Sequence, residues 1–503
     1  MAGIGFKLRA YTQEGTFLGF TKAYIHATLV ASGPWVLTVI SLVVCQLLIA
    51  HTGLAHIYSQ FLMETVIYIF AFSLITTAPL QLAVIRYLAD QLDALRLDSH
   101  FPALVSVTMV NVIFHAIVGF VFMLGIDTTW AYRLGAVCLF VLVAEVWVIM
   151  AFIGAVRAHH LVGSAFTSGL LVTIVMAYLL RFTWLHKTQE PVLAYLVALI
   201  LGQVTILAIT LTALAREFEF HSRWNFDWWP YAKRYPAMAA SGFFYYLALW
   251  ISSFVYWFCP GPGRELMRGD YMWAFPPIDL AAFFAQMSIL PAVVVFFVHT
   301  ETDFYEDYRG FYNAVLARKG LNIVIQRRQK LTQNLKDALY SIMVVQLVCT
   351  LGALVFAPFL EGFYDFDGYK IHLFRVCALG AAPQAMLLFV LVITYYFQFY
   401  RQALITSLVT FVVAFLTALW TLQAGMEWYG LGLFVGCTTG LILGTLWLFK
   451  KLQSLEYLTF MSQPVAEEIP FQSDMMTDGR FGTYTRKDGQ MVEAQPQRGG
   501  KKA

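Results

Sequence analysis

Long apolar runs recur along almost the whole chain, and short polar segments separate them. Most runs reach the roughly 20 residues that an α-helix needs to cross the hydrocarbon core of a bilayer. The strands of a membrane barrel alternate polar and apolar positions instead, so we expect helices, which satisfy their backbone hydrogen bonds internally. The pattern predicts twelve helices, at residues 27–50, 62–85, 103–126, 134–156, 162–181, 191–214, 236–258, 274–298, 338–357, 374–398, 402–424 and 430–449.

The composition supports this interpretation. Hydrophobic residues make up 59% of the 503 residues and charged residues 13%, whereas soluble proteins average about 45–50% and about 25%. We therefore expect an all-α polytopic membrane protein. The first apolar run, 27–50, is long enough to span a membrane and no small-residue cleavage site follows it. It is therefore expected to remain as a helix rather than act as a cleaved signal peptide.

The distribution of lysine and arginine predicts that both termini are cytoplasmic. Cytoplasmic loops of membrane proteins carry an excess of these residues. With the N-terminus inside, the interior segments hold most of the 33 basic residues, including a cluster within the loop 215–235. Residues 1–26 then form a cytoplasmic amphipathic segment. The net charge of +3 gives no indication of nucleic-acid binding.

A partial internal repeat predicts two lobes of six helices with a cavity between them. The triplet Ala-Ser-Gly at 31–33 recurs at 240–242, and Pro79 in the second predicted helix has a counterpart, Pro291, in the eighth. Two halves of this kind are typical of transporters, whose substrate path lies between them. The predicted segments are an N-terminus (1–26), an N-terminal lobe (27–214), a cytoplasmic linker (215–235), a C-terminal lobe (236–449) with a cytoplasmic loop (299–337), and a largely disordered cytoplasmic tail (450–503).

Helix-breaking residues predict local kinks in these spans. Gly33 and Pro34 lie near the cytoplasmic end of the first predicted helix, and Pro79 and Pro291 lie within the second and eighth. Proline lacks the backbone donor and clashes with the carbonyl four residues earlier, so a kink is expected at each. Such a kink is tolerated only where the freed carbonyl meets protein or a wet cavity. The kink at Pro34 is expected to shape the N-terminal lobe's side of the cytoplasmic opening.

Four polar residues inside the predicted spans are candidates for coupling or transport, because a charge at mid-bilayer costs at least about 2.5–3.5 kcal/mol. Glu145 lies at the centre of the fourth predicted helix, and Asn111 and His115 lie one turn apart in the third. A Glu145–His115 contact would bind and release a proton; a structural hydrogen bond between packed helices is the alternative. Asp279 is the fourth candidate, and a water-exposed vestibule explains it equally well.

The predicted cytoplasmic loop 299–337 contains an amphipathic helix. Phe304, Tyr308 and Phe311 form part of an aromatic stripe at helical spacing, and a basic cluster that includes Arg327 and Arg328 follows. One interpretation is a helix that lies in the membrane interface and binds anionic headgroups. The other is a docking surface for a cytoplasmic partner.

Signatures of catalysis and of cofactor binding are missing from the sequence. No Gly-x-x-x-x-Gly-Lys-Ser/Thr phosphate loop occurs, so we expect no ATP hydrolysis by this chain. The six cysteines are scattered singly and show no Cys-x-x-Cys spacing, which disfavours a metal site or a disulfide framework. We therefore expect a protein that is not an enzyme and that needs neither a metal nor a cofactor.

The N-terminal segment carries a family resemblance. The stretches Met-Ala-Gly-Ile-Gly-Phe at 1–6 and Ser-Gly-Pro-Trp at 32–35 resemble the PelG-type family of Pel exopolysaccharide transporters, which belongs to the multidrug/oligosaccharidyl-lipid/polysaccharide (MOP) flippase superfamily. The match is sharpest over about the first forty residues, and the span count and two-lobe plan extend it over 1–460.

The resemblance implies a twelve-helix, two-lobe, alternating-access fold in a Gram-negative inner membrane. It also implies export of a hexosamine-rich polysaccharide that a cytoplasmic glycosyltransferase makes, with membrane partners that include a cyclic-di-GMP receptor subunit. The function expected on this basis is polysaccharide export, either by alternating access or as a polymer channel.

Other functions stay open at this point. The same superfamily contains ion-coupled exporters of small lipophilic molecules and flippases for lipid-linked oligosaccharides. A membrane polymerase or ligase acting on lipid-linked sugars is less consistent with the sequence. Such an enzyme is expected to carry a large outer loop with paired His, Arg or Asp residues, whereas the predicted outer loops are short.

Overall fold

A computed structural model describes residues 33–51, 56–94, 97–155, 160–184, 192–217, 224–268, 272–362, 367–461, 484–487 and 490–493. The chain divides into two units, Met1–Gln453 and Ser454–Ala503. The first unit contains all the long helices.

The described residues contain eleven helical segments that are long and apolar enough to cross a membrane. The first predicted span corresponds to a further helix, α3 (Gly33–Ala50), so each of the twelve predicted spans has a helical counterpart. The all-α membrane fold is thereby confirmed. The long helices are α4 (His56–Asp93), α5 (His100–Leu124), α6 (Trp130–Ala155), α7 (His160–Trp184), α8 (Leu193–Glu217), α10 (Pro236–Phe258), α14 (Leu321–Phe356), α15 (Gly368–Tyr396), α16 (Tyr400–Ala424), α17 (Leu431–Gln453) and the continuous run Pro276–Leu316.

Short elements lie at the ends of the long helices. The strands β1 (Glu265–Arg268) and β2 (Met272–Ala274) pair antiparallel between α10 and the run that begins at Pro276. The other short elements are α9 (Trp229–Arg234) and the 3₁₀ turns η1 (Leu97–Ser99), η4 (Ala357–Gly362) and η5 (Met426–Trp428).

The α-helical form of the run Pro276–Leu316 is interrupted twice. It consists of α11 (Pro276–Ala285), a 3₁₀ turn η2 (Gln286–Ile289), α12 (Leu290–His299), a π-helical segment η3 (Thr300–Phe304) and α13 (Tyr305–Leu316). Pro291 lies in the first turn of α12, where the missing N–H costs little because that donor has no partner within the helix. A 3₁₀ turn thus lies just before Pro291, and the kink expected at this proline stays a prediction.

The other expected kinks have different outcomes. α4 runs through Pro79 without an interruption in its helical assignment. Gly33 and Pro34 are the first residues of α3 as described, and the residues before them lie outside the described part. The kink at Pro34 therefore stays a prediction.

Two further differences from the predicted elements concern polar segments. α14 begins at Leu321 rather than at 338, so the basic cluster continues a membrane helix. In the second unit, α18 (Leu455–Met461) is followed by the strands β3 (Tyr484–Lys487) and β4 (Gln490–Glu493), which form an antiparallel hairpin. The dipeptide Asp-Gly, which favours two-residue hairpin turns, separates the strands in the sequence.

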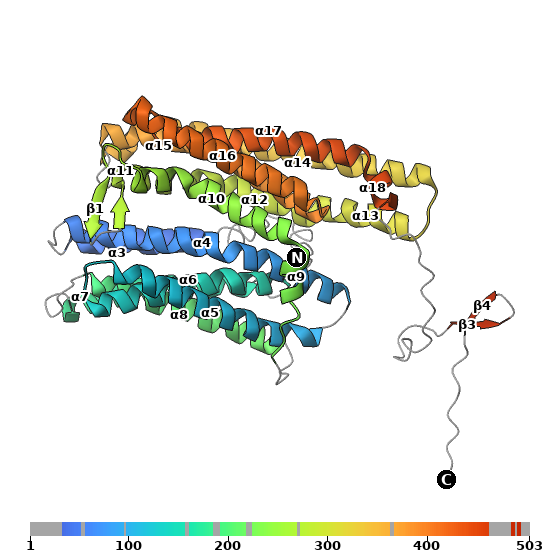
Figure 1. The fold of residues 1–503 in the computed structure, drawn as a ribbon, viewed down its shortest axis with the longest axis horizontal. Helices are drawn as coiled ribbons and strands as arrows, with labels where there is room; N and C mark the ends of the chain where they lie inside the picture. The colour runs from blue at the N-terminus through green and yellow to red at the C-terminus, as the bar shows by residue number, and fades with distance from the viewer. Residues whose placement is uncertain are drawn as a thin grey trace, which may run out of the picture. The chain divides into compact units, whose positions relative to one another are not determined.

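The helices of the first unit pack in two groups. In one group α5 packs on α6, α6 on α4 and α8, and α7 on α3 and α8. In the other, α10 packs on α16, α17 on α15 and α16, and α15 on α11 and α14. α4 packs on both α10 and α11, and so joins the two groups (Figure 1).

A row of glycines lets α16 and α17 approach closely. Gly432, Gly436, Gly440 and Gly444 lie four residues apart on α17, on the face that meets α16. A Cβ at Gly436 would lie 2.6 Å from the Cβ of Ala414 and 2.9 Å from the Thr410 carbonyl oxygen. Small residues at helix interfaces are a general means of association in membranes, where lipid removes the hydrophobic drive.

We predict that Gly436→Ala destabilises the protein by about 1–3 kcal/mol, the usual cost of overpacking a tight contact. Gly352→Ala in α14 is the matched control, because a Cβ there meets nothing within 4 Å, and alanine is the better helix former. Thermal unfolding of the purified variants in one detergent measures the difference. Equal melting temperatures would contradict the tight contact.

Candidate functional site

Aromatic side chains make the contact between the two helix groups. The rings of Tyr68 on α4 and Trp257 on α10 stack, with centroids 4.4 Å apart and planes 11° from parallel. One turn further along α4, Phe72 stacks on Phe254 at 5.1 Å. The Tyr68 hydroxyl also donates a hydrogen bond to the carbonyl oxygen of Trp273 on β2. These contacts hold α4 against α10 and the β1–β2 hairpin.

Asp279 lies at the edge of the same contact. Its Oδ2 accepts hydrogen bonds from the Trp257 indole Nε1, at 2.8 Å, and from the Phe275 backbone nitrogen, at 3.0 Å. The side chain is in the first turn of α11 and is only 4% exposed. Asp279 therefore fixes both the start of α11 and the Trp257 ring. This burial does not fit a water-exposed vestibule.

Glu64 on α4 is a buried acid that the sequence analysis missed. It is 2% exposed and interacts electrostatically with Asp279. The apolar pattern placed the start of the second span at 62, which put Glu64 at a helix end where an acid is unremarkable. α4 in fact begins at His56. The apolar residues Ile57 and Phe61 are the signal for the longer helix.

The other three candidate residues lie together, buried between α4, α5 and α6. Glu145 Oε1 accepts a hydrogen bond of 2.7 Å from Asn111 Nδ2. His115 bonds elsewhere, with Nδ1 2.9 Å from the Asn111 carbonyl oxygen and Nε2 2.8 Å from Thr76 Oγ1. Because a carbonyl only accepts, Nδ1 is the donor to Asn111. The Thr76 hydroxyl also donates to the Phe72 carbonyl oxygen, at 2.6 Å.

The expected hydrogen bond between Glu145 and His115 is thus replaced by one from Asn111. Asn111 and His115 lie one turn apart on the same face of α5. Of these two possible partners, Asn111 is the one that bonds to Glu145. Glu145 Oε2 and Asn111 Oδ1 have no hydrogen-bond partner among the described residues. A proton on Glu145 or a buried water would satisfy such atoms, so the cluster suits proton binding as well as helix packing.

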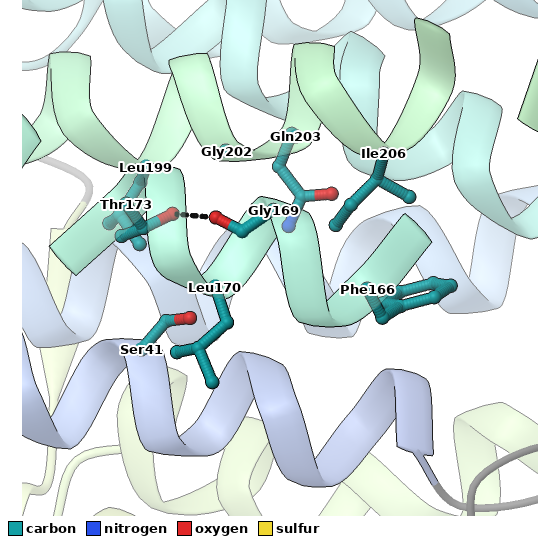
Figure 2. A pocket seen from close by; sticks show the side chains of 9 residues that line it. All are labelled: Ser41, Phe166, Gly169, Leu170, Thr173, Leu199, Gly202, Gln203 and Ile206. Carbon is teal, nitrogen blue, oxygen red and sulfur yellow. Dashed lines mark hydrogen bonds between the residues drawn. The ribbon is translucent and has the colours of Figure 1, made fainter. Parts of the chain in front are cut away.

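A small cavity lies within the first helix group, between α3, α7 and α8 (Figure 2). It has room for roughly one water molecule, which is far too little for a sugar. Thr173 Oγ1 donates to the Gly169 carbonyl oxygen at its wall, at 3.0 Å. Its lining residues are Ser41, Phe166, Gly169, Leu170, Thr173, Leu199, Gly202, Gln203 and Ile206. This cavity is not a transport path.

The aromatic stripe of the predicted loop is packed inside the protein. Phe304 and Phe311 are 3% and 0% exposed. The Phe304 ring lies 5.2 Å from that of Tyr396 at the end of α15, and the Tyr308 hydroxyl donates to the Tyr396 carbonyl oxygen at 3.2 Å. The stripe therefore holds α13 on α15 and is not accessible to a docking partner in this conformation.

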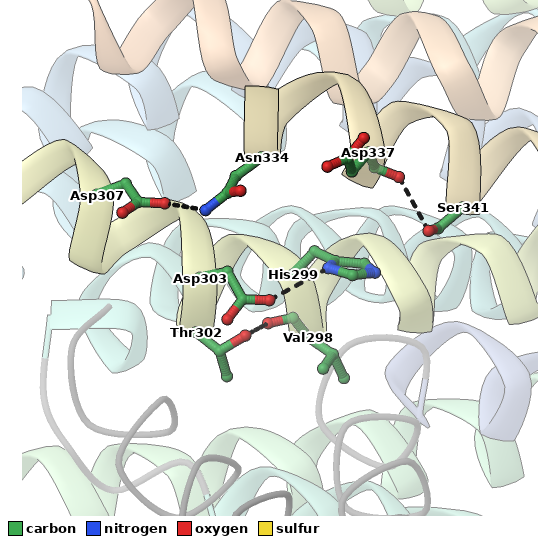
Figure 3. Close-up of polar contacts among 8 residues, drawn as sticks. All are labelled: Val298, His299, Thr302, Asp303, Asp307, Asn334, Asp337 and Ser341. Atoms are coloured by element: carbon green, nitrogen blue, oxygen red, sulfur yellow. Dashed lines mark hydrogen bonds and ion pairs between the residues drawn. The ribbon is translucent and has the colours of Figure 1, made fainter. Parts of the chain in front are cut away.

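Polar contacts fix α13 against α14 (Figure 3). Asp307, itself 4% exposed, accepts a hydrogen bond from Asn334 and pairs with Lys330 Nζ at 2.9 Å. Arg328 donates to the carbonyl oxygens of Leu452 and Gln453 at the end of α17. Arg327 is exposed. Of the two arginines named as docking candidates, Arg328 is used within the protein and Arg327 faces outward.

Within the described ranges, no group of three or more His, Cys, Asp or Glu side chains is placed to hold a metal ion.

The helices are arranged as in the MATE transporters of known structure. A crystal structure of a MATE transporter superposes with a TM-score of 0.60 at 12% identity, covering 87% of this chain and 97% of that one. An outward-facing multidrug resistance MATE family transporter of the MOP superfamily gives 0.59 at 14% identity, covering 86% and 96%. A Vibrio cholerae MATE transporter gives 0.59 at 13% identity, covering 90% and 97%. At these identities the likeness shows the fold.

The chain belongs to the PelG family, whose model, described as a putative exopolysaccharide exporter, matches residues 1–460. No curated protein matches the sequence. The resemblance of the N-terminal segment to this family is thereby confirmed.

We predict that Asn111→Ala destabilises the protein by about 1–3 kcal/mol, because the buried Glu145 carboxyl group loses its donor. Asn322→Ala, at an exposed position of α14, is the matched control and should leave stability unchanged. The double variant Asn111→Ala/Glu145→Leu should recover part of the loss. Thermal unfolding at one pH measures all three, and an Asn111→Ala variant as stable as the control would argue against the pairing.

Proposed function

We propose that this protein exports a hexosamine-rich exopolysaccharide of the Pel type from the cytoplasm across the bacterial inner membrane. The observation that carries the proposal is the family match over 1–460, in a multi-pass chain with the fold of MOP transporters. In this proposal both termini are cytoplasmic, and the chain itself performs no chemistry on the polymer.

Alternating access is the mechanism that the packing favours. The two helix groups are each tightly packed and meet along α4. The aromatic contacts of Tyr68 and Phe72 with α10 close the path on one side. Rocking of one group against the other would break these contacts and open that side while the opposite side closes.

The Glu145 cluster is the part of the first helix group that we propose to couple transport to protons. An acid with one unpaired oxygen, buried beside an amide and a histidine, is costly in the membrane. Binding and release of a proton there would change the packing of α5 on α6. Maintenance of helix packing alone is the competing role.

Replacement of the chromosomal gene tests function and coupling together. We expect deletion to abolish the secreted hexosamine polymer, the wild-type gene to restore it, and Glu145→Gln to restore little of it at equal protein level. Hexosamine content of the secreted material is the measurement. Normal export by Glu145→Gln would leave Glu145 with a packing role only.

The alternatives give different outcomes in the same strains. Altered drug susceptibility with unchanged secreted polysaccharide would favour an exporter of small lipophilic molecules. Accumulation of a lipid-linked oligosaccharide in the deletion strain would favour a flippase. Either result would refute the Pel-type proposal.

A cytoplasmic glycosyltransferase and the membrane subunits of a Pel-type synthase are the partners that we propose. The part of the predicted docking segment that is available to a partner is the end of α13 and the start of α14. It carries Arg327 and the exposed side chains Leu316, Leu321 and Ile323. Arg327 contributes positive charge there without an intramolecular ion pair among the described residues.

We predict that Arg327→Glu weakens co-purification of the glycosyltransferase and leaves the melting temperature unchanged. Arg328→Ala should instead lower the melting temperature, because Arg328 holds the end of α17. Pull-down from solubilised membranes with each variant separates the two effects. Full recovery of the glycosyltransferase by Arg327→Glu would exclude this surface.

A further inference from the structure

Two buried carboxyl groups lie at the contact between the helix groups, one from each group. Glu64 comes from α4 and Asp279 from α11, they are 2% and 4% exposed, and they interact electrostatically. Glu64 Oε2 and Asp279 Oδ1 have no hydrogen-bond partner among the described residues. One carboxyl oxygen of each acid thus lacks a hydrogen-bond partner where α4 meets α11.

The surroundings of the two acids differ. Asp279 accepts from Trp257 Nε1 and from the Phe275 backbone nitrogen, and both bonds stabilise its ionised form. No hydrogen bond to the Glu64 carboxyl group is present among the described residues. An unpaired buried carboxylate is strongly disfavoured, so Glu64 is the group that carries a proton while the contact is closed.

Among the described residues, the neighbouring ionisable groups supply no positive charge to the pair. Glu265 on β1, Tyr68 on α4 and Cys377 on α15 interact electrostatically with Glu64 or Asp279, and each is either neutral or negative. The Arg264 guanidinium on the adjoining hairpin lies on the Trp273 ring, 4.1 Å from its centroid. Ionisation of both acids would therefore place two like charges together without compensation.

We propose that Glu64 and Asp279 form a proton-binding site that holds α4 on α11 only while one of the two carboxyl groups is protonated. The proton comes from water and returns to water when the contact opens. Closure is favoured at low pH, where the pair holds its proton, and is lost as pH rises and Glu64 ionises. This site is separate from the Glu145 cluster and does not depend on which polymer the protein exports.

Distance measurements between the helix groups test the proposal on the full chain. Spin labels at Ile57→Cys on α4 and Trp428→Cys on η5 report on the two groups from exposed positions. Cys138, Cys259 and Cys349 are replaced by serine, whereas the buried Cys45, Cys377 and Cys437 are retained. Pulsed electron paramagnetic resonance in lipid nanodiscs then gives the distance distribution between pH 5 and pH 9.

We expect the doubly labelled parent to show one short distance at low pH and a growing longer population at high pH. Glu64→Gln, an amide that mimics the protonated acid, should keep the short distance at every pH, and Asp279→Asn should do the same. Glu361→Gln at an exposed position is the matched control and should titrate like the parent. A parent without pH response, or a Glu64→Gln variant that responds like the parent, overturns the proposal.

A fallback and one further measurement complete the test. If one of the two amide variants aggregates, the pH series of the parent and of the other amide variant still test the proposal. Repeating the series with sodium replaced by choline distinguishes a proton from a metal cation, because shortening that follows sodium and not pH would overturn the proton assignment.

Discussion

Helices in a bilayer gain little by exchanging lipid contacts for contacts with one another, so close approach and polar contacts must hold them together. The second helix group follows this constraint. The glycine row of α17 lies against Ala414 and Thr410 of α16, and Gln286 and Gln384 exchange two amide hydrogen bonds of 2.9 and 3.1 Å between η2 and α15. Tight contacts of this kind favour movement of this group as one body.

The contact between the groups is built differently. It consists of stacked rings on α4 and α10 and of two acids, Glu64 and Asp279, whose hydrogen bonding is incomplete. Ring stacking contributes only about 0.5–1.5 kcal/mol per pair beyond buried area, and the acids favour closure in only one protonation state. A contact that is weak and sensitive to protonation is suited to repeated opening, whereas the glycine and amide contacts are not.

Apolar run length predicted every span, because the bilayer fixes both the length and the helical form of a crossing segment. It failed where polar residues continue a helix beyond the apolar run. The early start of α4 hid Glu64, and the helical start of α14 was assigned to a loop. The positions of Asn111, His115 and Glu145 along their helices predicted that the three residues lie at one depth in the membrane. Which of them pairs with Glu145 depends on the side-chain geometry, and the structure shows that it is Asn111. The burial of Phe304 could not be predicted from the sequence either, because an apolar stripe that packs on protein has the same spacing as one that packs on lipid.

The packing of α13 and α14 links the predicted cytoplasmic surface to the second helix group. α13 continues from α12 through the π-helical segment, Phe304 packs on the end of α15, and Arg328 binds the last carbonyls of α17. Asp307 locks α13 onto α14 through Asn334 and Lys330. A partner bound at Arg327 would therefore act on α12, α15 and α17 together. A synthase subunit bound there would act on the equilibrium between closed and open groups, because a ligand shifts such an equilibrium by its difference in affinity for the two states.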